Sequence, residues 1–322
     1  MKPMIVFLSL CLLFASGSKA QAEKYPDHPL RMIVPFAPGG AADITARVIG
    51  EGLSKQIGQP VIVESHAGAG GTIGANLVAH APPDGYTILF TTPGQQITLP
   101  YLIKPLPYDP DDLKPVSLVA VVPGVLVVRN NLQVKSVQEL IDLAKSKPGQ
   151  IHFGSAGIGS SGHLNTELLQ SLAHIKLEHV PYKGASEAQR DLISGRIDMA
   201  IDTIGAYLSQ IKAGTVIPLG VTTPEPVSIL PDVPPIAATL PDYKSSPINY
   251  NYLSAPAKTP DNIMRILNEA MNKVMQKPEI QKKLLDHAIL ARVNTSAQMA
   301  DLVESERVKW KIIIDQAGIL PQ

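Results

Sequence analysis

The sequence predicts an α/β protein of two lobes, built on two parallel-rich sheets that a two-strand hinge joins. Its 322 residues suit two domains of about 100–200 residues each, and hydrophobic residues make up 45%, enough for packed cores. Two successive series of apolar runs alternate with helical patterns, as in parallel sheets with helices on both faces. Strand-like segments near 125 and 250 lie between the series, so we expect them to cross between the lobes.

The elements of the first series are followed by a long β-branched run that Pro123-Gly124 interrupts. After the second series, a proline-rich connection leads to three helices that we expect to pack on the first lobe. We therefore assign 23–124 plus 246–322 to lobe 1 and 125–245 to lobe 2, with a ligand between the lobes at the carboxyl ends of the strands. The predicted strands are 30–36, 61–64, 86–91, 116–129, 151–154, 177–182, 197–201, 216–222 and 249–255, and the predicted helices are 41–56, 72–81, 137–146, 162–173, 186–195, 205–213, 261–276, 278–287 and 296–318.

Residues 1–22 have the layout of a cleavable signal peptide. Lys2 precedes an apolar run over 4–15, and small residues then permit cleavage after Ala20 or Ala22. The run is shorter than the about 20 residues of a membrane-spanning helix, and the alternative is a buried N-terminal helix. We therefore expect a periplasmic protein. The single cysteine, Cys11, lies inside this segment, which excludes a disulfide framework and a cysteine-rich zinc site.

Charge and histidine spacing exclude further classes of function. Lys+Arg and Asp+Glu both number 28, so the chain lacks the excess of cations that nucleic-acid binding needs. The eight histidines include no His-x-x-x-His pair, so a metal hydrolase would lack its ligands. We expect no nucleic acid, no metal and no cofactor.

A glycine-containing loop, 35–43, joins the first predicted strand to the first helix. Gly39 and Gly40 lack a Cβ, so their N–H groups can approach a ligand closely. Amides at a helix start favour an anion such as a carboxylate, and Asp43 can satisfy free amides or contact a ligand donor. The same glycines would also serve a plain strand-to-helix turn, and the local pattern does not choose between the two interpretations.

The loop 154–163 occupies the corresponding place in the second series. It contains Gly157-x-Gly159-x-x-Gly162, formally a dinucleotide fingerprint. However, it lies in the second half of a chain addressed to a compartment where nicotinamide cofactors are scarce. The same geometry suits any small anion at a helix start, and we favour that over a purely structural turn. The loop adds the hydroxyls of Ser155, Ser160 and Ser161.

A serine hydrolase is the less favoured alternative. Ser160, Ser161 and His163 are close in sequence and Asp202 ends a later strand, so a triad can be imagined. A nucleophile elbow needs Gly-x-Ser-x-Gly, and neither serine has glycine at both positions. We expect His163 instead to hydrogen-bond to the ligand or to close the helix start.

Longer stretches carry a more specific signal. They are YPDHPLRMIVPFAPGGAADITARVIGEGL (25–53), GAGGTIGANLVAHAPPDGYTILF (68–90), LPYDPDDLKPVSLVA (106–120), HFGSAGIGSSGHLNTELL (152–169), HVPYKGASEAQRDLISGRIDMAIDT (179–203), GVTTPEPVSILPDVPP (220–235) and APAKTPDNIMRILNEAM (255–271). In order and spacing, from about Tyr25 to the C-terminus, they resemble the Bug family, the extracytoplasmic solute receptors of tripartite tricarboxylate transporters.

This resemblance implies a monomeric periplasmic binding protein, type II-like, with no catalytic activity. It would capture a small organic carboxylate and deliver it to membrane permease subunits, or else report it to the sensor kinase of a two-component system. In the family, backbone amides, hydroxyls and ordered water hold the carboxylate, without an arginine clamp. No arginine or lysine lies in 36–43 or 154–163, and the nearest, Arg47 and Lys183, are outside. The ligand-binding residues that the resemblance implies are Phe36, Pro38, Gly39, Gly40, Asp43, Thr91, Thr92, Gly157, Ser160, Ser161, His163, Asp202 and Thr203.

One departure from the family concerns the segment before the late Ala-Pro. The family's usual Trp-x-Gly is replaced by Asn251-Tyr252-Leu253. We expect Tyr252 and Leu253 to lie near the hinge and to alter the volume of the cleft.

Overall fold

The computed structural model describes residues 25–39, 41–182, 184–243, 249–316 and 318–321. The predicted signal peptide, Gly40 and Lys183 lie outside the described residues. Within these ranges the predicted helices and strands are present, with boundaries within about two residues of those expected, except that the 116–129 run begins as a strand three residues earlier. Every helix in the described part of the chain is too short or too polar to cross a bilayer.

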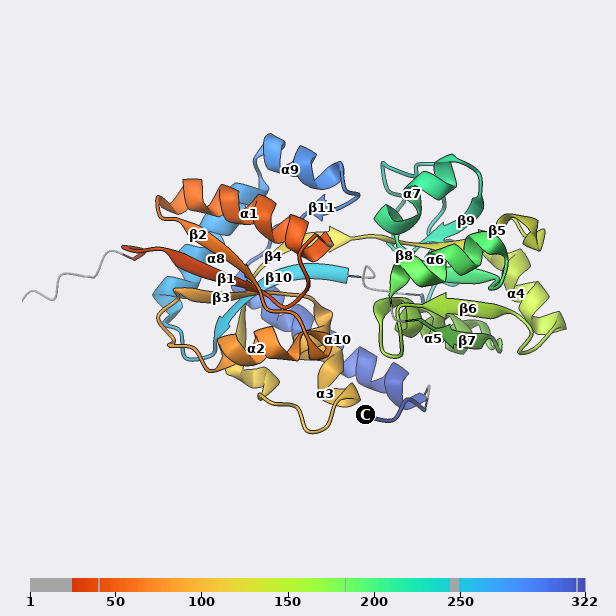
Figure 1. The fold of residues 1–322 in the computed structure, drawn as a ribbon, viewed down its shortest axis with the longest axis horizontal. Helices are drawn as coiled ribbons and strands as arrows, with labels where there is room; N and C mark the ends of the chain where they lie inside the picture. Colours follow the sequence, from red (N-terminus) through yellow and green to blue (C-terminus); the bar gives the residue numbers. More distant parts are fainter. Residues whose placement is uncertain (1–24, 40, 183, 244–248, 317, 322) are drawn as a thin grey trace, which may run out of the picture.

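The described strands form two sheets, one in each lobe (Figure 1). The first sheet has six strands in the order β11-β4-β10-β3-β1-β2, and the second has five in the order β7-β6-β8-β5-β9. The two-lobed α/β fold that the sequence predicts is confirmed. The strands are β1 (Leu30–Val34), β2 (Val61–Ser65), β3 (Thr87–Thr91), β4 (Leu113–Val122), β5 (Gly124–Arg129), β6 (His152–Ser155), β7 (Glu178–Pro181), β8 (Met199–Thr203), β9 (Val216–Val221), β10 (Asn249–Pro256) and β11 (Leu290–Ala291).

Both sheets are mixed, because each takes in antiparallel strands. β1 pairs in parallel with β2 and β3, whereas β10 runs antiparallel between β3 and β4. In the second sheet β6 pairs in parallel with β7 and β8, whereas β5 runs antiparallel between β8 and β9. β5 and β10 are the strands with which the chain enters each sheet from the other lobe.

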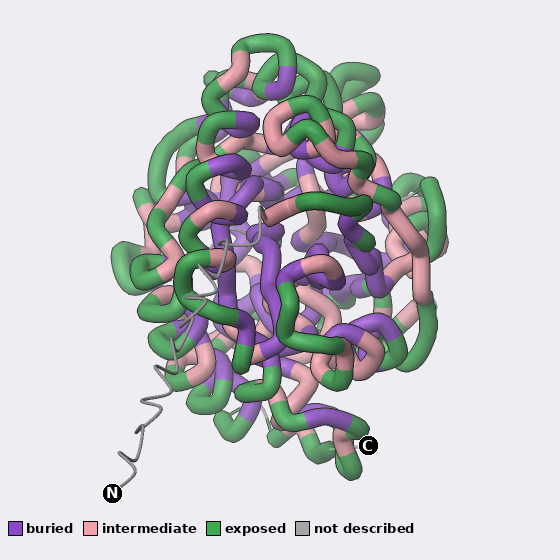
Figure 2. The backbone as a smooth tube through the Cα atoms, turned by 90° about the vertical axis from the view of Figure 1, so that its left-hand side faces the viewer, coloured by how far each residue is buried: buried purple, intermediate pink, exposed green. Residues whose placement is uncertain are grey.

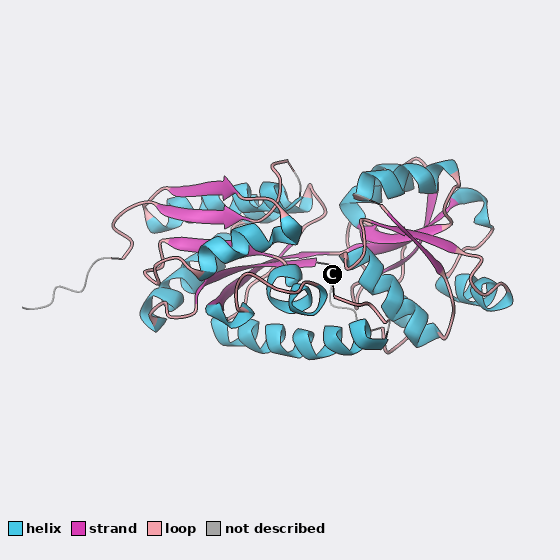
Figure 3. Cartoon of the chain, turned by 60° about the horizontal axis from the view of Figure 1, so that its bottom comes forward, coloured by secondary structure: helices cyan, strands magenta, loops and turns pink. Residues whose placement is uncertain are grey.

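Helices cover both faces of each sheet (Figure 3), and burial concentrates in the strands that they enclose (Figure 2). The sequence does not predict the π-helical turn Gly94–Thr98, the short α3 or β11. The helices are α1 (Ala41–Ile57), α2 (Thr72–Ala79), α3 (Leu99–Leu102), α4 (Val137–Ser146), α5 (Ser161–Ala173), α6 (Ala185–Ser194), α7 (Ile204–Lys212), α8 (Asp261–Met275), α9 (Pro278–Leu285) and α10 (Ser296–Gln316).

The last helix differs from expectation, because α10 packs on both lobes. α8 packs on α1 and β4 as expected, and α10 also contacts β4. Farther along, α10 contacts α5, and Trp310 and Ile313 share an apolar cluster with Leu168 and Leu169 of the second lobe. Figure 1 shows α10 leaving the first lobe and reaching below the second. The connection between the lobes is therefore more than the two crossing strands.

Gly162 sets how closely α5 approaches β8. A Cβ built on Gly162 would lie 2.4 Å from the backbone oxygen of Ile201. Because that oxygen belongs to a central strand, it cannot move aside as a side chain can. We expect Gly162→Ala to lower the free energy of unfolding by about 1–3 kcal/mol, measured by urea denaturation.

Gly50→Ala is the matched control, since it adds the same methyl group to a helix. The new Cβ would meet side-chain atoms alone, those of Val63 at 2.9 Å and of Val61 at 3.8 Å. The higher helix propensity of alanine, about 1 kcal/mol, offsets the contact. Equal losses of stability in the two variants would contradict this account of Gly162.

Candidate functional site

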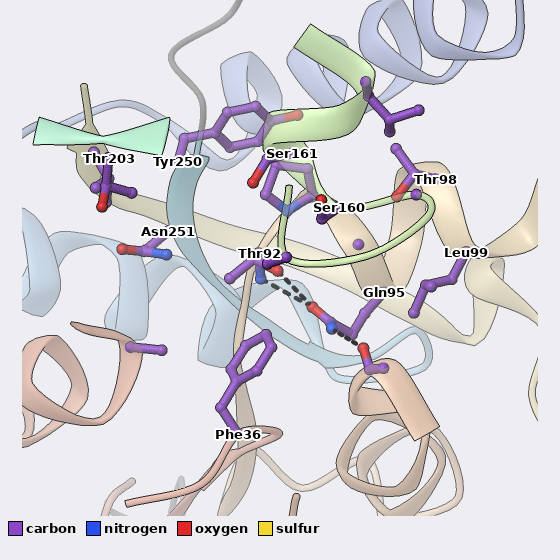
Figure 4. A pocket seen from close by; sticks show the side chains of 18 of the residues that line it. Phe36, Thr92, Gln95, Thr98, Leu99, Ser160, Ser161, Thr203, Tyr250 and Asn251 are labelled. Carbon is purple, nitrogen blue, oxygen red and sulfur yellow. Dashed lines mark hydrogen bonds between the residues drawn. The ribbon is translucent and has the colours of Figure 1, made fainter. Parts of the chain in front are cut away.

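A cavity of about 630 Å³ lies between the lobes, at the carboxyl ends of strands from both sheets (Figure 4). Thr92 follows β3, and Thr203 ends β8. The described residues of its wall include no Asp, Glu, Lys, Arg or His side chain. An anion bound here would therefore have to be stabilised by neutral groups. Apolar side chains cover much of the remaining surface, among them Phe36, Leu99, Val122, Ile158, Leu164 and Trp310.

Several helices begin at this wall. α1 contributes Ala41 and Ala42, α5 contributes Ser161, and the residues preceding α6 and α7 contribute Gly184 and Thr203. Thr203 makes no side-chain hydrogen bond to the first turn of α7, and Gly184, before α6, has no side chain that could make one. First-turn N–H groups have no partner within their own helix and carry a partial positive charge. The helix starts thus make the wall electropositive, although its described residues include no cationic side chain.

Gln95, which the sequence analysis did not single out, fixes the wall next to β3. The side chain is fully buried, and its Oε1 accepts from the Thr92 N–H at 3.0 Å, the Thr92 hydroxyl at 3.1 Å and the Thr91 hydroxyl at 3.0 Å. Its Nε2 donates to the Gly70 carbonyl at 3.1 Å (Figure 4). Gln95 therefore links Thr92 to the loop that contains Gly70, before α2. The signal for it was a pair of glutamines separated by three residues from the end of a predicted buried strand.

His163 supports the corresponding loop of the second lobe from behind the wall. Its Nδ1 accepts the Gly159 N–H at 3.0 Å, and its own N–H donates to the Ser160 hydroxyl at 3.4 Å. Its ring stacks on His179 with centroids 4.1 Å apart, and His179 stacks on Phe153. Burial, and then the neighbouring His179, lower the pKa of His163 to about 4. A neutral His163 thus acts as a hydrogen-bond acceptor that shapes the loop.

The structure brings some of the predicted site residues to the wall and leaves others behind it. Asp43 lies below its loop, where it accepts the Gly39 N–H at 3.0 Å and pairs with Arg47 at 2.9 Å. Arg47 is the main cause that lowers the pKa of Asp43. Asp202 accepts the Thr203 N–H at 2.6 Å, and burial raises its pKa. Phe36, Thr92, Ser160, Ser161 and Thr203 are at the wall, whereas Pro38, Gly39, Asp43, Thr91, Gly157, His163 and Asp202 are not.

Strand β10 and helix α10 add wall residues that the sequence analysis did not predict. Tyr250 and Asn251 line the cavity, whereas Tyr252 and Leu253 are fully buried and do not reach it. Only the first part of β10 borders the cavity, so the side chains expected to alter its volume lie beyond it. The indole N–H of Trp310, from α10, donates to Glu306 at 2.9 Å, which orients the ring.

A serine hydrolase needs a hydrogen bond between its histidine and its nucleophilic serine, and this bond is not found around His163 in the described structure. The Nδ1 atom of His163 is taken by the Gly159 N–H, and its Nε2 lies 3.6 Å from Glu167. Among the described residues, neither ring nitrogen is hydrogen-bonded to Ser160 or Ser161. The geometry thus assembles no serine–histidine pair for nucleophilic catalysis.

The sequence matches a family model described as the tripartite tricarboxylate transporter family receptor over residues 45–319. The chain belongs to this family. It is 33% identical over 305 residues to the protein BugT of Bordetella pertussis, which covers 94% of this chain and 93% of BugT. It is 37% identical over 310 residues to the UPF0065 protein of the tcbD-tcbE intergenic region of Pseudomonas sp. (strain P51), covering 95% and 91%. The Bug-family resemblance is therefore confirmed.

Solved structures of relatives share this fold. R. palustris Rpa4515, solved with adipate, superimposes with a TM-score of 0.80 at 34% identity, over 92% of this chain and 100% of that one. MatC from Rhodopseudomonas palustris, with bound malate, gives 0.75 at 30% identity, over 90% and 100%. The periplasmic binding protein BugD gives 0.74 at 31%, over 92% and 100%. The fold is that of periplasmic binding proteins, and the chain is a solute-binding receptor of the Bug family.

His163 should make folding of this receptor sensitive to acid. Its pKa in the folded chain, about 4, lies below the ordinary value of 6.5, so between these values the unfolded chain takes up a proton that the folded chain does not. Stability should therefore fall as the pH is lowered from about 6.5 towards 4. Thermal unfolding across this range should show a smaller dependence in His163→Gln. A difference between the two proteins that is the same at every pH would contradict the assignment.

Proposed function

We propose that this chain is a periplasmic receptor that binds a small organic carboxylate between its lobes, unchanged, and delivers it to the membrane subunits of a tripartite tricarboxylate transporter. The observation that carries the proposal is a cavity whose described wall holds no charged side chain and at which the helices α1, α5, α6 and α7 begin. The relatives solved with adipate and with malate, both carboxylates, support it. The description of the family, as the receptor of a tripartite tricarboxylate transporter, supports the proposed transporter partner.

The carboxylate would be held by neutral donors. First-turn N–H groups of the helices at the wall point towards an anion, and hydrogen bonds to a charged group contribute about 1.5–3 kcal/mol each. The Ser160 hydroxyl accepts the His163 N–H and keeps its own proton to donate. Phe36 and Trp310 would cover the carbon skeleton. Behind the wall, Asp43, Thr91 and His163 would keep the loops in shape, as their present hydrogen bonds do.

Binding would draw the lobes, 23–124 plus 246–322 and 125–245, together. Pro123, between β4 and β5, is where the chain passes from the first sheet to the second, so small backbone rotations there would move one sheet relative to the other. A ligand that contacts both lobes favours the closed form, which the permease would recognise. One chain supplies the described wall of the cavity from both lobes, so a monomer would suffice. Residues 1–22, as a signal peptide, would direct it to the periplasm.

A thermal-shift screen tests the substrate class. We expect a member of a panel of mono-, di- and tricarboxylates, including adipate and malate, to stabilise the protein by about 2.7 kcal/mol at a hundredfold excess over Kd. Neutral sugars and their alcohols serve as controls of the same size. Stabilisation by the neutral compounds alone would contradict a carboxylate receptor.

Ala42 allows a test of the charge of the ligand. It is half-buried in the first turn of α1 and lines the cavity. Two unit charges about 6 Å apart, at an effective dielectric constant of about 20, repel by about 3 kcal/mol. We therefore expect Ala42→Glu to bind the best carboxylate at least about tenfold more weakly than the nearly isosteric Ala42→Gln, measured by calorimetry. Equal affinities in the two variants would show that the bound group is not an anion.

A further inference from the structure

Asn251 presents a buried side-chain amide to the cavity, and this amide is not hydrogen-bonded to any described residue. The residue is only 3% exposed, lies on β10 and lines the wall. Its side chain has no hydrogen-bond partner among the residues that the structure describes. The buried amide of Asn268 contrasts with it, since that Nδ2 donates to the carbonyls of Val116 and Asn294, each at 2.9 Å. The side-chain amide of Asn251 is thus able to hydrogen-bond to a ligand in the cavity.

A buried side-chain amide lowers the stability of the folded protein unless solvent or a ligand hydrogen-bonds to it. Leaving such a group unpaired costs about 1–3 kcal/mol, and in a native protein it calls for a specific explanation. Solvent in the open cavity can pair with it, but a ligand that excludes the solvent must supply the partner itself. An asparagine therefore favours a ligand with a matching polar group and penalises one without it.

The position of Asn251 separates this polar group from the others at the wall. Figure 4 shows the side chains of Tyr250 and Asn251 leaving β10 in opposite directions, with Asn251 on the side of Thr203. Ser160 and Thr98 lie towards the other side of the view. The pairing of β10 with β4 shifts register directly after Asn251, an irregularity of the kind that re-aims side chains next to binding sites. A ligand that spans the cavity would therefore contact Ser160 with one of its groups and Asn251 with another.

The chemistry of the amide indicates which group this is. Asn251 offers two N–H donors and one acceptor oxygen. A carboxylate only accepts, so it would leave the Asn251 oxygen unpaired, and an ammonium only donates. A hydroxyl group does both, and it fits a wall that holds no charged side chain among its described residues. We propose that Asn251 determines specificity by hydrogen-bonding to a hydroxyl group on the ligand, so that the substrates are hydroxylated carboxylates; this rests on the carboxylate receptor proposed above.

The test uses pairs of acids that differ by one hydroxyl group: butanoate and 3-hydroxybutanoate, succinate and malate, benzoate and 4-hydroxybenzoate. Calorimetry on the mature protein should show, in at least one pair, the hydroxylated acid binding about tenfold more tightly or better. In Asn251→Leu, which is nearly isosteric, and in the smaller Asn251→Ala, this preference should fall to less than about threefold, while the acid without the hydroxyl keeps its affinity within a similar factor.

Asn76→Leu is the matched control. Asn76 has a buried side-chain oxygen without a partner, but it lies on α2 and does not line the cavity. We expect Asn76→Leu to leave the preference for the hydroxylated acid unchanged.

The outcomes separate the two proposals. Binding of acids without a hydroxyl preference in the wild type, or a preference that persists in both Asn251 variants, overturns the role of Asn251 and leaves the carboxylate receptor standing. If no acid binds, while neutral compounds do, the proposed function fails and the specificity role fails with it.

Discussion

The architecture depends on how the chain enters each sheet. The parallel strands of both lobes end at the cleft, so a strand that arrives from the cleft must run in the opposite direction. β5 and β10 are those arriving strands, and each lies antiparallel inside the sheet that it enters. Because each arriving strand is hydrogen-bonded on both edges, the crossings are anchored in the cores of both lobes. This insertion holds the two carboxyl edges facing one another.

The electrostatic character of the cavity follows from the same constraint. A helix that follows a parallel strand begins at the carboxyl edge of that strand, so α1, α5, α6 and α7 all start at the cleft. Their first-turn N–H groups therefore converge on one space, and no cationic side chain is needed to attract an anion. A positive wall made of backbone persists when side chains change, which leaves the side chains free to select among ligands.

Three buried side chains at or behind the wall hold its loops in place. Gln95, Asp43 and His163 each pair with a loop N–H group, namely those of Thr92, Gly39 and Gly159. Each is buried, and each satisfies backbone that the loop would otherwise leave unpaired beside the cavity. The wall is thereby preorganised, so a ligand need not supply the cost of ordering it.

The sequence by itself determined the alternation of strands and helices, the position of loops 35–43 and 154–163 after predicted strands, the absence of cations from them and the family resemblance. These features depend on periodicity and on residues close together in the chain. Only the tertiary structure decided the direction of β5 and β10, the packing of α10 on both lobes, and the place of Gln95 and Asn251 at the wall. Gln95 donates a hydrogen bond to the carbonyl of Gly70, and Asn251 lines the same cavity as Thr203. Each role therefore arises from segments that are distant in the sequence. Local patterns cannot encode such contacts, because they join segments far apart in the sequence and exist only once the chain has folded.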